Sequence, residues 1–156
     1  MGSTDEHKGW LRRLFGRTQA SALDPTRPDL VVVVASYDDA EACSSALDTA
    51  ASESPRWQPE EESVLRHHLL LPRDRIDDAV AVASQDGYAA APDTGEQEPS
   101  GEDTVPLTLQ RVQLLDALHC SQERSRMAGL AQRLDGTVTG WDALQPVRDD
   151  AASTAG

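Results

Sequence analysis

The chain of 156 residues is 38% hydrophobic and only 4% aromatic, which suits one domain of ordinary size with polar tails. Its 27 acidic residues outweigh 14 lysines and arginines, and the formal net charge is −13. Phosphates would be repelled by such a chain, so we expect no direct nucleic-acid binding and favour basic partners. The alternative, that the acidity only keeps the chain soluble, stays open.

The two cysteines, Cys43 and Cys120, form no Cys-x-x-Cys motif. This suits a reducing compartment better than a disulfide scaffold and predicts structural roles for both. The sequence has no apolar run of membrane-spanning length, and no apolar signal segment followed by a cleavage site. We therefore expect a cytoplasmic protein.

Residues 1–29 are expected to be a flexible N-terminus that ends in a proline-containing linker, and its segment 8–17 predicts a short basic amphipathic helix. The apolar face of this helix carries Trp10, Leu11, Leu14 and Phe15, and the basic residues around it are Lys8, Arg12, Arg13 and Arg17. Such a helix can lie weakly on an anionic membrane surface, dock into a partner groove or pack on its own domain.

A single domain is predicted over residues 30–146, beginning with the β-branched run 30–35, which is typical of a strand buried on both faces. An alanine-rich helix over 38–52 should follow, with Ser36 or Asp38 as its N-cap.

A second strand is predicted at 64–71, then a helix from Pro72 to about Asp86 that ends at Gly87, and a short strand at 88–91. The apolar residues of this helix recur at helical spacing and should be buried: Ile76, Ala79, Val80 and Ala83.

Residues 92–104 contain five acids and no base and predict a mobile acidic loop. A functional alternative is that this loop competes for a basic, RNA-binding segment of a nuclease. The strand predicted at 105–115 begins near Pro106, which favours a sheet edge. Its apolar phase shifts after Leu109, which predicts a bulge near Gln110 and Arg111.

The last helix is predicted at 119–134, with Ser121 as its N-cap. Its inward stripe should be Met127, Leu130, Ala131 and Leu134, and a second stripe, Gln122, Arg126, Gly129 and Arg133, should face solvent or a partner. A turn at Asp135 and Gly136 leads into a closing strand over 137–144, and the tail 147–156 is expected to be disordered.

These elements place the chain in the α+β class. Residues 64–144 follow the order βαββαβ, which predicts a ferredoxin-like antiparallel sheet with two helices on one face. The N-terminal strand-helix unit should add a fifth strand, at a position in the sheet that the sequence leaves undetermined.

Over residues 64–144 the chain resembles the regulator of ribonuclease activity B family. The resemblance rests on the order of Arg66-His67-His68-Leu69, Gly87-Tyr88, the acidic loop and Gly140-Trp141. It implies a ferredoxin-like fold and a protein that inhibits the endoribonuclease RNase E by binding it, without catalysis and without a cofactor. The chain departs from the family in its short, weakly acidic tail, in Thr139 where the family has aspartate, and in its added N-terminal unit.

Four residues are the predicted partner contacts: Gln122, Arg126, Arg133 and Trp141. Arginines on an acidic protein can recognise carboxylates or phosphates, and tryptophan is favoured at interface hot spots, although core packing is an open alternative for Trp141. Reversing the charge of Arg126 and Arg133 is expected to weaken partner binding and leave the fold intact.

The sequence indicates no enzyme, because no phosphate-binding loop, nucleophile elbow or zinc-binding helix motif is present. His67 and His68 are adjacent on a predicted strand and should point to opposite faces, so they cannot chelate one metal ion without further ligands, and we expect no metal site. The predicted function is therefore regulation of an RNase E/G-type ribonuclease. The alternative is a membrane-surface adaptor that is tethered through Trp10, Arg12, Arg13, Phe15 and Arg17.

Overall fold

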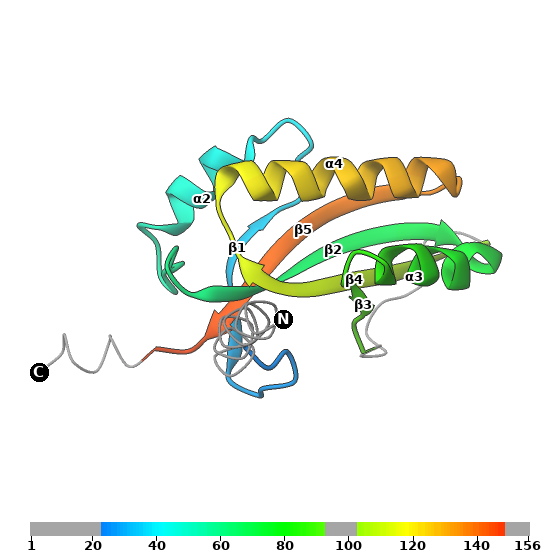
Figure 1. Ribbon diagram of the computed structural model, residues 1–156. Coiled ribbons are helices and arrows are strands. Elements are labelled where there is room, and N and C mark those ends of the chain that lie inside the picture. Colours follow the sequence, from blue (N-terminus) through cyan, green and yellow to red (C-terminus); the bar gives the residue numbers. More distant parts are fainter. Residues whose placement is uncertain (1–22, 93–102, 149–156) are drawn as a thin grey trace, which may run out of the picture.

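The computed structural model describes residues 23–92 and 103–148. The basic segment 8–17, most of the acidic loop and most of the tail lie outside the described residues. The elements in chain order are β1 (Leu30–Ser36), α2 (Cys43–Ala50), β2 (Glu62–Pro72), the short 3₁₀ turn η1 (Arg73–Arg75), α3 (Ile76–Ser84), β3 (Ala89–Ala90), β4 (Thr104–Leu114), α4 (Ala117–Arg133) and β5 (Thr137–Pro146) (Figure 1).

The five strands form one sheet in the order β1-β5-β2-β4-β3, and every neighbouring pair is antiparallel. This confirms the predicted α+β class with a five-stranded antiparallel sheet. The prediction that residues 30–35 are buried on both faces is wrong, because β1 is an edge strand and Val32 is 41% exposed. A β-branched run is typical of a central strand, but here its only described strand neighbour is β5.

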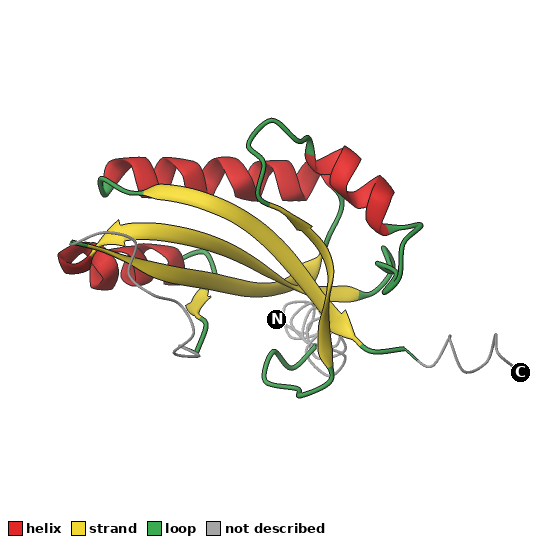
Figure 2. Cartoon of the chain, turned by 180° about the vertical axis from the view of Figure 1, so that it is seen from behind, coloured by secondary structure: helices red, strands yellow, loops and turns green. Residues whose placement is uncertain are grey.

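The helices α2, α3 and α4 of the described residues cover the same face of the sheet, as Figures 1 and 2 show. Leu65 of β2 is buried in a core cluster with residues of α2 and α4. Leu69 and Leu71, which share its face because side chains alternate along a strand, pack in a second cluster with residues of α3 and α4. The long helix α4 therefore joins both halves of the core, and the predicted inward stripe of Met127, Leu130 and Ala131 is buried.

The N-caps differ from the predicted ones. The side chain of Asp116 accepts a hydrogen bond from the His119 N–H (2.7 Å), so α4 begins before Ser121, which lies inside the helix. Asp38 uses its carboxylate in a local turn, where it accepts from the Ala40 N–H (2.9 Å) instead of capping α2. Aspartate stabilises turns and caps by the same hydrogen bond, so the sequence alone does not distinguish the two.

The bulge predicted near Gln110 and Arg111 is wrong, because β2 and β4 pair in regular register over their whole length. Arg111 lies on the same face as Leu109, toward the helices, and its guanidinium stacks over the Tyr88 ring (4.6 Å to the centroid). The apolar alternation of the sequence is therefore interrupted at Arg111 because a polar residue occupies the inner face there, and the strand itself stays regular.

The two predicted glycine turns are confirmed. Gly87 follows α3 with a φ of +83°, which glycine adopts without the steric cost of a Cβ atom. Asp135 adopts a φ of +63° between α4 and β5, and the following residue, Gly136, lies against the main chain of β2. These turns connect α3 to β3 and α4 to β5.

Candidate functional site

The two adjacent histidines of β2 lie on opposite faces of the sheet, as predicted. His67 is fully buried on the helix-covered face, whereas His68 lies on the other face. Each histidine belongs to a different polar cluster, and these two clusters contain most of the buried charge of the described residues.

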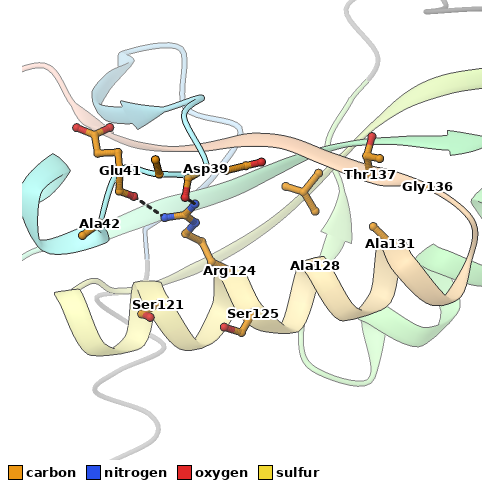
Figure 3. A pocket seen from close by; sticks show the side chains of 12 residues that line it. Asp39, Glu41, Ala42, Ser121, Arg124, Ser125, Ala128, Ala131, Gly136 and Thr137 are labelled. Atoms are coloured by element: carbon orange, nitrogen blue, oxygen red, sulfur yellow. Dashed lines mark hydrogen bonds between the residues drawn. The ribbon is translucent and has the colours of Figure 1, made fainter.

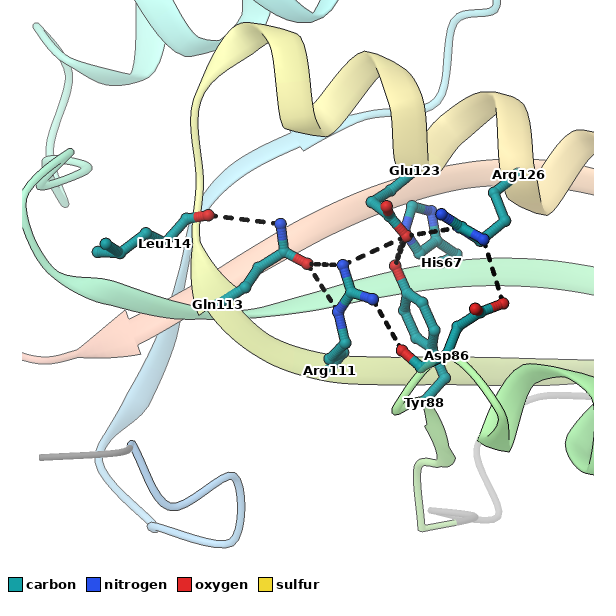
Figure 4. A network of polar contacts seen from close by, with 8 residues as sticks. All are labelled: His67, Asp86, Tyr88, Arg111, Gln113, Leu114, Glu123 and Arg126. Atoms are coloured by element: carbon teal, nitrogen blue, oxygen red, sulfur yellow. Dashed lines mark hydrogen bonds and ion pairs between the residues drawn. The ribbon is translucent and has the colours of Figure 1, made fainter. Parts of the chain in front are cut away.

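The first cluster is centred on Glu123 of α4, which is only 5% exposed (Figure 4). Its carboxylate accepts the Tyr88 hydroxyl hydrogen (2.7 Å) and lies 3.3 Å from an Arg111 guanidinium nitrogen and 3.2 Å from that of Arg126. Burial alone would raise the pKa of Glu123, but these partners outweigh burial and lower it below its ordinary value. Glu123 is therefore an ionised carboxylate whose Oε1 faces three donors.

Arg111 and Arg126 extend this cluster to the end of α3. Arg111 donates to the main-chain oxygen of Asp86 (2.8 Å) and to the side chain of Gln113, and Arg126 forms an ion pair with the Asp86 carboxylate (3.2 Å). Figure 4 shows that the two guanidinium groups converge on Glu123 from β4 and α4. The cluster thus connects β4, α4 and the turn after α3, and its geometry indicates a structural role.

Arg126 is therefore a structural residue as well as a predicted partner contact. The sequence alone led us to expect that its charge reversal leaves the fold intact, but a carboxylate there would face both Glu123 and Asp86, so we predict a loss of stability instead. Arg133, by contrast, is exposed in the last turn of α4, where its guanidinium donates to the Gly129 carbonyl oxygen (3.3 Å).

We predict that R126E lowers the free energy of unfolding by about 2 kcal/mol, the scale of a lost hydrogen bond to a charged group. R133E should lower it by less than about 1 kcal/mol, because it removes one exposed hydrogen bond to the Gly129 carbonyl and reverses a favourable interaction with the helix dipole. Urea unfolding of both variants measures the difference. Equal losses would show that Arg126 is no more structural than Arg133.

His67 is held neutral in this cluster. Burial lowers its pKa to about 4, and its Nε2 lies 3.4 Å from the Tyr88 hydroxyl oxygen. Because the Tyr88 proton is donated to Glu123, Nε2 of His67 must carry the hydrogen and donate to that oxygen. Nδ1 of His67 has no hydrogen-bond partner within the described part of the chain.

Acid should therefore destabilise the fold in the pH range where an ordinary histidine becomes protonated. As pH falls below about 6.5, the unfolded chain protonates this histidine while the folded chain does not, which removes about 3 kcal/mol of stability by pH 4. We expect H67Q to lose less stability than the unmodified chain between pH 7 and pH 4. Urea unfolding at both pH values tests this, and an unchanged pH dependence in H67Q would contradict it.

The second cluster lies on the sheet face that the helices leave open. Asp142 of β5 is 2% exposed and accepts two hydrogen bonds from Arg66 (2.7 and 2.6 Å). Nε2 of His68 lies 3.1 Å from the same carboxylate, and Nδ1 lies 3.1 Å from the Thr108 hydroxyl. Burial opposes ionisation of Asp142, but the hydrogen bonds from Arg66 and His68 outweigh it, and its pKa lies below the ordinary value.

Tyr37 covers this second cluster from the end of β1. Its ring centroid lies 5.8 Å from that of His68, and a Cβ atom at Gly140 would overlap the Tyr37 ring. Sequence reasoning assigned no role to Arg66, Asp142 or Tyr37. Strand alternation could have placed Arg66 and His68 on one face, but their pairing with Asp142 depends on β5 lying beside β2.

A groove of about 540 Å³ runs between α4 and the segment that connects β1 to α2 (Figure 3). Arg124 reaches across it from α4 and donates to the main-chain oxygens of Glu41 (2.7 Å) and Asp39 (3.2 Å). The hydroxyls of Ser121 and Ser125 also line the groove. The lining therefore combines a charged residue from α4, two hydroxyls and main-chain groups of the segment before α2.

The predicted partner contacts separate into two groups. Gln122, Arg126 and Arg133 are exposed along one side of α4, and we call these three residues the α4 polar stripe. Trp141 is 1% exposed and packs in the core cluster with Val34 and Leu65, so its side chain cannot anchor a partner at the surface. The predicted membrane or partner contacts in the segment 8–17 lie outside the described residues.

The two cysteines lie in the core cluster that joins α2 to α4, and both are free thiols. Burial, followed by a hydrogen bond to Cys43, raises the pKa of the Cys120 thiol. A buried thiol with a raised pKa is a weak nucleophile. This fits the structural role predicted for both.

Among the described residues, no group of three or more histidines, cysteines and acids is placed to hold a metal ion. Within the same residues, no helix combines the length and apolar character needed to cross a membrane. Comparison with protein-family models, with curated proteins and with solved structures finds no match to this chain.

Proposed function

We propose that this chain is a non-catalytic regulator that binds and inhibits an RNase E/G-type endoribonuclease and so modulates RNA turnover. The proposal extends the resemblance of residues 64–144 to the regulator of ribonuclease activity B family. It includes the finer fold assignment: a ferredoxin-like βαββαβ unit from β2 to β5, to which β1 and α2 are added.

The observation that supports the proposal most is the strand order β5-β2-β4-β3, with α3 and α4 on one face. Numbered within the unit, the spatial order is 4-1-3-2, and all pairs are antiparallel. This is the arrangement expected of the fold that the resemblance implies. The buried acids Glu123 and Asp142 both accept hydrogen bonds from other elements, which fits a structural role for them.

The α4 polar stripe is the surface that we assign to the ribonuclease. Gln122 and Arg133 are separated by three helical turns, about 16 Å, which is enough for a continuous contact along α4. Arg126 lies between them but is committed to Asp86 and Glu123, so Gln122 and Arg133 are the residues to vary.

A direct binding measurement tests this assignment. The full chain is titrated with the purified RNase E/G-type enzyme of its own host in a calorimeter, and the double variant Q122A/R133A is titrated in parallel. We expect binding by the unmodified chain and at least about a tenfold weaker dissociation constant for the variant, about 1.4 kcal/mol. R73A, an exposed arginine near α3, is the matched control and should bind normally.

Two results would contradict the proposal in different ways. If the unmodified chain fails to bind the enzyme, the function is wrong. If Q122A/R133A binds as tightly as R73A, the function stands and the α4 polar stripe is only a solvated surface.

A further inference from the structure

The outer edge of β1 has no strand neighbour in the described part of the chain, since β1 pairs with β5 alone. Its sequence, Leu-Val-Val-Val-Val-Ala-Ser, contains neither a charged residue nor a proline. Charges and prolines are the usual means of blocking an exposed edge against pairing with another chain. The register of β1 with β5 shifts between Val32 and Val34, and on either side of this irregularity no charge or proline prevents an additional strand from pairing.

A groove of about 280 Å³ lies along this edge, between β1 and α2. We call it the β1–α2 groove. Its strand side is formed by residues 32–35. Its helix side includes Ala46, Thr49 and Ala50, which recur at helical spacing in α2 and so share one face, and Glu53 lines the groove beyond the end of α2. Small alanine side chains on the helix leave room for the side chains of an added strand. The edge of β1 and its connection to α2 can be followed in Figure 2.

The charged residues that line the β1–α2 groove are Glu41 and Glu53, and both are acidic. They flank α2, whose eight residues span about 12 Å. In an extended strand, residues i and i+4 point to the same side, about 13 Å apart. Basic side chains on that side of an added strand would face an acidic groove.

We propose that the β1–α2 groove binds an extended segment of a partner protein that carries basic side chains, and that this segment pairs with β1 as a sixth strand. Main-chain hydrogen bonds to β1 supply affinity, and the two glutamates select for positive charge. This inference does not depend on the partner being a ribonuclease.

A second copy of this chain fits the groove less well. Two copies would each bring a net charge of −13, and neither the β1 strand nor the groove supplies a basic residue to offset it. The chain's own basic segment 8–17 is predicted to be helical, and a helix cannot supply free main-chain groups to a strand edge.

The probe is a nine-residue peptide of valine and threonine with arginines at positions 3 and 7. Its matched control carries glutamates at those two positions, and a second control carries proline at position 5 to remove a main-chain donor. Each peptide is titrated into the full ¹⁵N-labelled chain, and amide chemical shifts are followed by NMR. We expect the arginine peptide to shift amides of β1 and α2 and to bind at least tenfold more tightly than either control.

Protein variants test the charge selection separately. E41R/E53R should invert the preference and bind the glutamate peptide more tightly, whereas E60R/D77R, which changes two exposed acids outside the groove, should keep the original preference. The proposal is overturned if arginine and glutamate peptides bind equally or if shifts appear only away from β1 and α2. A dimer in sedimentation experiments that competes with the peptide would also overturn it, because the occupant would then be a second copy.

Discussion

Replacing Gly136 with alanine is expected to lower the free energy of unfolding by about 3 kcal/mol, the upper part of the range for an overpacked site. A Cβ atom there would overlap a methyl group of Leu71 and the main-chain carbonyl oxygen of Leu70. The methyl group could rotate away, but the carbonyl belongs to β2, which is paired on both sides. Relief would require β2 or the turn after α4 to move.

Gly129→Ala is the matched control for this prediction. Gly129 lies inside α4, and no atom lies within 4 Å of the position that its Cβ would take. Alanine should therefore stabilise the helix by about 1 kcal/mol. Urea unfolding of both variants should give changes of opposite sign. Similar changes would show that the contact between the turn at Gly136 and β2 is not tight.

Asp142→Asn is expected to have an effect of similar size, about 3 kcal/mol, because it removes one partner of a buried ion pair. The amide would keep the volume of the carboxylate but present hydrogen-bond donors where Arg66 and His68 also donate. Arg66 is partly exposed and can regain some hydration, which keeps the loss from being larger.

A double-mutant cycle with Arg66→Met isolates this interaction. If Asp142 acts mainly through Arg66, the double variant should be more stable than the sum of the two single losses predicts, by about 1 to 3 kcal/mol. Additive losses would mean that Asp142 stabilises the fold through other contacts.

Local patterns predicted the elements of this fold well. The spacing of Met127, Leu130 and Ala131 identified the buried side of α4. Residues three and four positions apart lie on the same face of a helix, so the buried face can be read from the sequence alone. Strand alternation likewise placed His67 and His68 on opposite faces. These inferences need no knowledge of which strands are neighbours.

Predictions that depend on strand neighbours were incomplete. The run 30–35 has the composition of a central strand, but β1 lies at the edge, where β5 from the other end of the chain is its neighbour. The bulge predicted at Arg111 is instead a partly buried polar side chain whose partners, Tyr88 and Glu123, come from other parts of the chain. Sequence spacing alone carries no information on such distant pairs.

For the candidate site, too, local patterns were predicted well and contacts between distant segments were not. Helical spacing placed Gln122, Arg126 and Arg133 on one exposed side of α4, as the structure has them. It did not distinguish Arg126, which is held by Asp86 and Glu123, from the more exposed Arg133. Trp141 was offered as a surface anchor, but its position beside β1 and β2 buries it.

The central claim is that the chain regulates an RNase E/G-type ribonuclease by binding, and a cleavage assay tests it most directly. A fluorescent single-stranded RNA is incubated with the purified host enzyme and increasing amounts of the full chain. We predict that the initial cleavage rate falls to a saturating minimum and that Q122A/R133A requires at least about tenfold more protein for the same inhibition. A cleavage rate that stays constant up to a large molar excess of the chain would contradict the account.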